Sequence, residues 1–150
     1  MSFNNTPSSL KLHIGILGKT NVGKSSLINK ITNQPISIVS QISGTTTDVV
    51  YKSMEILGLG SVVFLDTAGY DDKSNLSNER LKQTKLAINK MDLALFLFTN
   101  EIDEEDLIWT KYLLSNNKKI IPIINKTDIL SKEKIENIKK SIAKELKITP

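Results

Sequence analysis

The sequence predicts an α/β fold built on a doubly wound, mostly parallel sheet with helices on both faces. The first observation is that short apolar runs alternate with longer amphipathic stretches, as in parallel strands joined by crossover helices. The second is a glycine-rich loop between the first apolar run and the first amphipathic stretch. The third is that two later apolar runs end in polar motifs, at the strand ends where sheets of this class bind ligands.

Each expected element has a pattern of its own. Strands are expected where apolar residues form short runs, at 11–17, 49–56, 61–65, 92–99 and 120–124. Helices are expected where apolar residues recur at helical spacing, at 25–32, 79–91, 103–115 and 131–146. The run 92–99 is strongly apolar and predicts a strand buried on both faces. The acidic run 103–106 predicts solvated charge that complements a helix dipole, and Ser131 predicts an N-cap.

The composition limits the functions open to the chain. At 150 residues we expect one domain, with residues 1–10 as a flexible lead-in and no second domain. The net charge of +4 is mild and scattered, so it argues only weakly for nucleic acid, and we do not expect a nucleic-acid partner. The absence of cysteine excludes disulfides and a thiolate-held iron–sulfur cluster in this segment. No signal peptide and no run of membrane-spanning length is found, so we expect a cytoplasmic protein without membrane contact.

Residues 18–26 read Gly-Lys-Thr-Asn-Val-Gly-Lys-Ser-Ser, the pattern of a phosphate-binding loop between a strand and a helix. Its glycines let successive backbone N–H groups turn toward an anion, and the following helix adds the positive end of its dipole. Lys24 supplies charge to the β- and γ-phosphates, and the Ser25 hydroxyl is placed to bind Mg²⁺. The predicted nucleotide contacts of this loop are Gly18, Asn21, Val22, Gly23, Lys24, Ser25 and Ser26.

Two further segments are predicted to complete the phosphate side. Asp66-Thr67-Ala68-Gly69 follows a strand, so Asp66 can hold Mg²⁺ through water and the Gly69 N–H can reach a γ-phosphate. The polar loop 33–48 offers the Thr46 hydroxyl as a ligand for Mg²⁺, with Thr45 or Thr47 as the alternative register. Thr45 and Thr46 are counted among the nucleotide contacts. The residues expected to carry catalysis are Lys24, Thr46 and Gly69.

The strand at 120–124 runs into Asn125-Lys126-Thr127-Asp128, which is predicted to bind the base. The Asp128 carboxylate can accept hydrogen bonds from N1–H and the exocyclic amino group of guanine. Adenine has no N1–H and would leave a desolvated carboxylate unpaired. Lys126 can lie along the base, and Asn125 can brace the loop. The predicted nucleotide is therefore GTP, with GDP as its product.

Together these motifs resemble those of the Ras-like, translation-factor-class P-loop GTPases, which implies a Ras-like fold. Residues 21–29 (Asn-Val-Gly-Lys-Ser-Ser-Leu-Ile-Asn) and Gly44-Thr45-Thr46 are similar to the TrmE–Era branch. Within that branch, residues 36–72 resemble the FeFe-hydrogenase maturation GTPase family, HydF. The features that carry this resemblance are Gly-Thr-Thr-Thr-Asp at 44–48 and the pair Asp71-Asp72. Val49 departs from the HydF pattern, in which proline is usual.

The HydF resemblance implies a GTP-hydrolysing switch domain within a longer protein that acts as a scaffold or carrier in hydrogenase cofactor assembly. It implies downstream dimerisation and iron–sulfur domains, hydrogenase or hydrogenase-maturase partners, and a homodimer as one arrangement. The chain stops at Pro150, before the sixth strand and final helix that the resemblance implies. We therefore expect 11–150 to be a C-terminally incomplete GTP-binding domain.

The resemblance also bears on the rate of hydrolysis. Tyr70 stands where Ras-type enzymes place a water-orienting glutamine, so unaided hydrolysis is expected to be slow. The TrmE resemblance implies that Asn21 helps to hold K⁺ and that K⁺ accelerates hydrolysis. Two alternatives stay open. One is an Era- or TrmE-like GTPase of ribosome assembly or tRNA modification, and the other is a GTP- and GDP-binding module with negligible turnover.

Overall fold

The computed structural model describes residues 11–32, 50–56, 58–67 and 78–147. Its strands are β1 (Leu12–Gly18), β2 (Val50–Ile56), β3 (Gly60–Asp66), β4 (Leu93–Phe98) and β5 (Lys119–Ile124). Its helices are α1 (Lys24–Thr32), α2 (Asn78–Lys90), α3 (Glu104–Ser115) and α4 (Lys132–Leu146). Within these ranges, no helix is both long enough and apolar enough to cross a bilayer.

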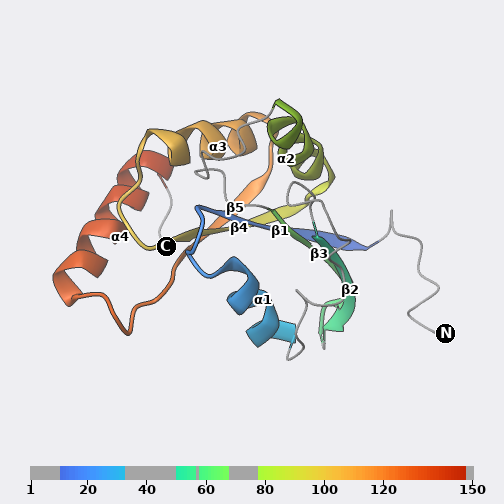
Figure 1. Ribbon diagram of the computed structural model, residues 1–150, viewed down its shortest axis with the longest axis horizontal. Coiled ribbons are helices and arrows are strands. Elements are labelled where there is room, and N and C mark those ends of the chain that lie inside the picture. The colour runs from blue at the N-terminus through green and yellow to red at the C-terminus, as the bar shows by residue number, and fades with distance from the viewer. Residues whose placement is uncertain (1–10, 33–49, 57, 68–77, 148–150) are drawn as a thin grey trace.

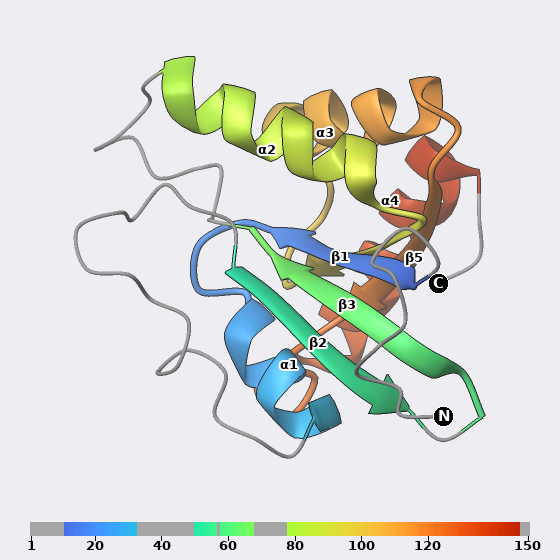
Figure 2. The ribbon, with the colours of Figure 1, turned by 90° about the vertical axis from the view of Figure 1, so that its right-hand side faces the viewer.

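The five strands form one sheet in the order β2-β3-β1-β4-β5. Strand β1 is central and pairs in parallel with β3 and β4, and β4 pairs in parallel with β5. Only β2 runs antiparallel, along the outer edge of β3 (Figure 2). Figure 1 shows the sheet nearly edge-on, with α1 on one face and α2, α3 and α4 on the other. The prediction of a mostly parallel, doubly wound sheet is confirmed.

Two apolar cores lie on the two faces of the sheet. Along β1 and β3, alternate residues point to opposite faces, because successive side chains of a strand do so. Leu17 and Leu65 face α2, α3 and α4, whereas Ile16 and Phe64 face α1. This double burial explains why the central strands read as continuous apolar runs in the sequence. The larger core lies between the sheet and helices α2, α3 and α4. The residues that these helices contribute to it are Ala87, Ile88, Met91, Trp109, Leu113, Ile138, Ile142 and Leu146.

Two helices begin at polar caps. Ser131 caps α4 by accepting a hydrogen bond from the Lys134 N–H, as predicted. Asp103 and Asp106 form a reciprocal capping box at the start of α3. The expectation of a wholly solvated acidic run was wrong for Asp106, which is 3% exposed. Its carboxylate turns back toward the cap and toward Lys19 of the phosphate loop, and this side chain is itself largely shielded from water.

The end of α2 is fixed to the start of β1. The His13 N–H donates to Asp92 Oδ2 over 2.8 Å, and the Asp92 N–H donates to the His13 carbonyl over 2.8 Å. Next to this pair of hydrogen bonds, a Cβ on Gly15 would lie 1.9 Å from Met91 Sδ. Only glycine therefore lets Met91 pack directly against the backbone of β1.

Candidate nucleotide-binding site

The phosphate loop connects the end of β1 to the start of α1. Gly18 and Gly23 have φ angles of +151° and +99°, in the region that favours glycine. A Cβ on Gly18 would lie 2.7 Å from Val22 Cγ2, so this turn also lacks room for a side chain. The Val22 side chain is buried beneath the loop, within the core on the α1 face. The glycines therefore allow the tight turn, and the buried Val22 side chain anchors the loop to the core.

Lys24 lies at the N-terminus of α1 with its ammonium folded onto the loop. The residue is 8% exposed, and its Nζ donates to the Gly18 carbonyl over 3.0 Å and to the Lys19 carbonyl over 2.6 Å. The positive end of the α1 dipole and this buried cation meet at the same place. Such a place suits a polyanion, as the sequence predicts.

Ser25 and Asp66 come together from α1 and β3. The Ser25 hydroxyl donates to Asp66 Oδ2 over 2.9 Å. The sheet fixes this approach, because Asp66 is in register with Ile16 of β1 and the following Thr67 hydroxyl donates to the Ile16 carbonyl over 2.8 Å. Two residues that were each predicted to hold Mg²⁺ are thus in contact in the described part of the chain.

The Asp66 carboxylate is largely buried, and one of its two oxygens has no hydrogen-bond partner among the described residues. That oxygen is Oδ1, which is itself buried. Burial raises the pKa of the carboxyl above its ordinary value, against the opposing effects of the Ser25 hydrogen bond and the Lys24 charge. An unpaired carboxylate oxygen beside a hydroxyl is a donor set that suits Mg²⁺, a hard cation with oxygen ligands. The residues fit a magnesium site, in which Ser25 and Asp66 would hold the ion.

Asp66→Asn is expected to raise the melting temperature of the metal-free, nucleotide-free protein at neutral pH. A carboxyl whose pKa is higher in the folded state takes up protons on folding, so the free energy of unfolding falls as pH rises above 3.8, the ordinary value, toward the folded pKa. The neutral amide avoids that loss. Thermal melts at pH 4 and pH 7.5 check this, because the advantage of the variant should be larger at pH 7.5. A variant that melts below the unaltered protein at pH 7.5 would contradict the argument from burial.

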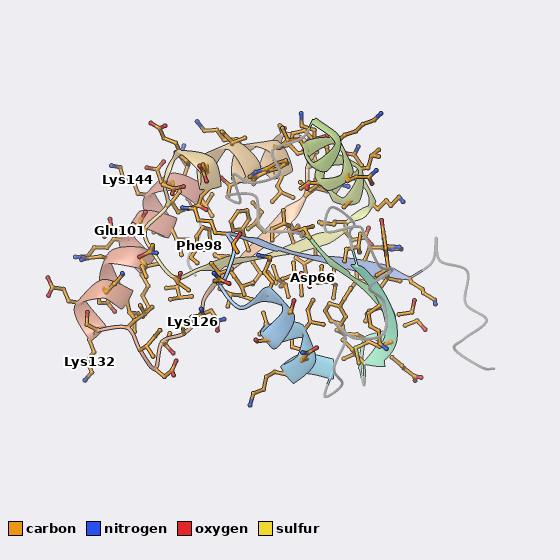
Figure 3. The ribbon with its side chains drawn as sticks, in the orientation of Figure 1. Asp66, Phe98, Glu101, Lys126, Lys132 and Lys144 are labelled. Carbon is orange, nitrogen blue, oxygen red and sulfur yellow. The ribbon has the colours of Figure 1, made fainter. Side chains whose placement is uncertain are left out.

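The loop after β5 contacts the phosphate loop directly. Asn125 Nδ2 donates to the Val22 carbonyl over 2.8 Å, and the Lys126 ammonium donates to the Asn21 carbonyl. The Asn125 N–H donates to the Phe98 carbonyl over 2.9 Å, which fixes this loop to the end of β4. In the view of Figure 3, Lys126 and Asp66 approach the start of α1 from opposite sides. Two predicted motifs more than 100 residues apart are therefore joined.

A cavity of about 440 Å³ opens between these loops. Its lining residues are Asn21, Gly23, Lys24, Ser25, Ser26 and Lys126. Asp128 is exposed in the turn that follows, closed by a hydrogen bond from the Ile129 N–H to the Lys126 carbonyl, and is not among the lining residues. The other predicted contacts, Thr45, Thr46 and Gly69, lie outside the described residues, as does Tyr70.

Gly23→Ala is expected to weaken nucleotide binding by disturbing the junction of the two loops. A Cβ at this position would lie 2.4 Å from Asn125 Nδ2, so Asn125 would have to leave the Val22 carbonyl. We expect a loss of about 1–3 kcal/mol in affinity for GDP, measured by calorimetric titration. Gly58→Ala is the matched control, because Gly58 also has a positive φ (+90°) but has no atom within 4 Å of the added Cβ. Equal affinities of the two variants would contradict a role for the junction.

One residue of the site was missed by the sequence reasoning. Lys19, the second residue of the phosphate loop, forms an ion pair with Asp103 and Asp106 at the start of α3. The Asp-x-x-Asp spacing at 103–106 indicates only a capping box that turns the second carboxylate back toward the helix start, and no local pattern brings Lys19 to it.

The family described as 50S ribosome-binding GTPase matches residues 13–126. GTPase Der of Clostridium acetobutylicum is 37% identical over 139 residues, which cover 87% of this chain and 32% of Der. The tRNA modification GTPase MnmE of Aliarcobacter butzleri is 38% identical over 120 residues, which cover 77% of this chain and 27% of MnmE. The chain thus spans about a third or less of these relatives.

Solved structures of Era are similar in fold and in sequence. Aquifex aeolicus Era bound to GDP and AlF₄⁻ has a TM-score of 0.72 and 30% identity, covering 93% of this chain and 50% of that one. Era in complex with MgGDPNP and nucleotides 1506–1542 of 16S ribosomal RNA has a TM-score of 0.69 and 31% identity, covering 88% and 46%. The Ras-like fold is therefore shown. The segment that matches the family contains the phosphate loop, the Ser25–Asp66 pair and the start of the loop after β5. The chain therefore belongs to the 50S ribosome-binding GTPase family, as a P-loop GTPase domain of the Era, MnmE and Der type.

Proposed function

We propose that this domain binds GTP and GDP with Mg²⁺ and hydrolyses GTP slowly, as a switch whose state depends on the γ-phosphate. One observation carries the proposal. The loop predicted to bind the base is hydrogen-bonded to the loop predicted to bind the phosphates, and a cavity opens between them at the start of α1. A nucleotide spanning both loops would place its phosphates at Lys24 and its base beyond Lys126.

The described residues account for binding and for part of the charge stabilisation. Lys24 and the N–H groups at the start of α1 would neutralise charge on the β- and γ-oxygens, where charge builds up during phosphoryl transfer. Ser25 and Asp66 would hold Mg²⁺, which supplies further neutralisation when bound. Tyr70 lacks the amide with which a glutamine orients water, so we expect an unaided rate near the ~10⁻⁴ to 10⁻³ s⁻¹ of intrinsic Ras.

Chain geometry supports Thr46, or Thr45 or Thr47 in the alternative register, as the hydroxyl that completes the metal site. The antiparallel register of β2 places Val50 opposite Asp66. Thr46 is four residues before Val50, so its Cα lies within about 14 Å of that of Val50 even in a fully extended chain. Gly69 is three residues after Asp66, and its N–H is proposed to contact the γ-phosphate.

We expect K⁺ to accelerate hydrolysis, with Asn21 among the groups that hold it. Asn21 lies at the cavity with its backbone in the left-handed region (φ 65°), and its carbonyl is bound to Lys126. Single-turnover release of phosphate from GTP is to be measured in potassium and in sodium chloride at equal ionic strength. Equal rates in the two salts would refute the role of K⁺, and no release in either would favour the binding module with negligible turnover.

The role of the whole protein is a separate proposal. Thr47 and the pair Asp71-Asp72 favour a role in hydrogenase maturation. In that role, the change between the GTP- and GDP-bound states would act on attached partner domains or on the second subunit of a homodimer. The Era structure that contains 16S ribosomal RNA favours the alternative of an RNA-directed GTPase. A cysteine-bearing segment downstream, with the absorption of an iron–sulfur cluster in the purified protein, would support the first. Tight RNA binding with a steep dependence on salt would support the second and refute the first.

A further inference from the structure

A cation of the phosphate loop contacts the start of α3. The Lys19 ammonium donates a hydrogen bond to Asp103 Oδ2 and lies 3.7 Å from Asp106 Oδ2. Asp103 and Asp106 are the two members of the α3 capping box, so the backbone of α3 itself fixes both carboxylates. Lys19 and Asp103 are 84 residues apart in the chain. The contact therefore connects two elements that only the tertiary fold brings together.

This contact is partly shielded from water. The Asp106 side chain is 5% exposed and that of Lys19 is 23% exposed, whereas that of Asp103 is 48% exposed, so salt screens the Lys19–Asp106 pair less than it screens a surface pair. Burial alone would lower the pKa of Lys19, but the hydrogen bond to Asp103 and the charge of Asp106 together raise it above its ordinary value. The pKa of Asp103 is held below its ordinary value, because the Lys19 contacts outweigh its own burial. Both partners are consequently charged at neutral pH.

Lys19 also contacts the phosphate-binding lysine through its backbone. Its carbonyl accepts the hydrogen bond from Lys24 Nζ at 2.6 Å, while its side chain is held by α3. A change of the loop that releases the Lys19 side chain would therefore move the carbonyl that Lys24 contacts. Accurate placement of a charged group matters, because small displacements weaken its interaction with a bound anion.

We propose that Lys19 is a positioning residue: its ion pair with Asp103 and Asp106 holds the phosphate loop so that Lys24 faces the β- and γ-phosphates of a bound nucleotide. The inference rests on the proposed function, since it concerns the affinity of the same site. Lys19 acts through Lys24, and α3 acts as the support on which the loop is held.

The test measures the rate at which a fluorescent GDP dissociates in the presence of Mg²⁺. Lys19→Met removes the ammonium and keeps the aliphatic stem. Asp103→Ser removes the carboxylate and keeps a side chain that can cap α3. Each variant is expected to release GDP about five- to tenfold faster, at the lower end of typical coupling between sites. Glu104→Gln, at an exposed carboxylate in the same helical turn, is the matched control and should leave the rate unchanged.

Three readouts distinguish positioning from a merely structural effect. The double variant of Lys19→Met and Asp103→Ser should release GDP no faster than Lys19→Met alone, because that single change already removes the contacts of Lys19 with both carboxylates. Lys19→Arg should restore slow release. The melting temperature of the nucleotide-free variants should change little, while its rise on addition of GDP should shrink.

An unchanged rate in Lys19→Met, or additive effects in the double variant, would overturn the proposal. If Asp103→Ser does not fold, Asp103→Asn takes its place, since asparagine also caps helices and carries no charge. Failure of the unaltered protein to bind GDP would instead refute the proposed function. The two failures are distinguishable because the first is seen only in the variants.

Discussion

Replacing Lys24 with alanine is expected to abolish the binding of GTP and GDP at micromolar concentration. The ammonium of Lys24 is buried at the start of α1, where the dipole of the helix adds to its charge. Removing one partner from a desolvated charged pair costs roughly 2–5 kcal/mol, which is about a 30- to 4,000-fold loss of affinity. The measurement is titration of the purified protein with fluorescent GDP and GTP in the presence of Mg²⁺.

Two further variants make this test decisive. Lys30→Ala removes an exposed lysine from the last turn of the same helix and should retain full affinity. Lys24→Met keeps the aliphatic stem, so it should lose the nucleotide while the melting temperature of the free protein stays close to that of the unaltered chain. Micromolar affinity in both Lys24 variants would show that another site holds the phosphates.

Asp128→Asn is expected to change the preference of the site from guanine to xanthine nucleotides. A carboxylate pairs with the N1–H and the amino group of guanine, whereas an amide pairs with N1–H and the carbonyl oxygen that xanthine has in place of the amino group. Each hydrogen bond to a charged group contributes about 1.5–3 kcal/mol, so the ratio of the two affinities should change by at least about a hundredfold. Competition of GDP and xanthosine diphosphate against a fluorescent nucleotide measures this ratio.

The position of Asp128 makes this test informative. Its side chain is exposed in the turn after Lys126 and does not line the described cavity. Glu133→Gln, at an exposed acid in the first turn of α4, should leave the preference for guanine intact. An unchanged preference in Asp128→Asn would show that the base is recognised by other groups, and the assignment of the loop after β5 would be wrong.

Much of the fold could be predicted because local rules and the global fold agree. The apolar runs became the five strands, with ends that moved by one or two residues, and the helices followed their 3.6-residue periodicity. Gly18 and Gly23 were predicted to shape an anion-binding loop, and both have positive φ angles there. Asp66 was placed near the phosphate-binding loop by the rule that ligand-binding residues lie at the carboxyl ends of parallel strands, and the structure brings it into contact with Ser25.

What the sequence did not reveal depends on contacts between distant segments. The burial of Asp106 and its pairing with Lys19 require the phosphate loop to lie beside α3, which no local pattern encodes. The unpaired Oδ1 of Asp66 likewise depends on how closely α1 covers the end of β3. The features that separate hydrogenase maturation from RNA-directed roles, Thr47 and Asp71-Asp72, lie outside the described residues. That assignment therefore stays a proposal.

The absence of a side chain at Gly15 has a mechanical consequence. Met91 occupies the space that a Cβ would take, and the two hydrogen bonds between His13 and Asp92 hold the same end of α2. Sliding α2 along the sheet would empty this space, at a cost of about 24 cal/mol for each Å³ of void. The packing of Met91 and the hydrogen bonds between His13 and Asp92 therefore fix the position of the C-terminal end of α2 along the sheet.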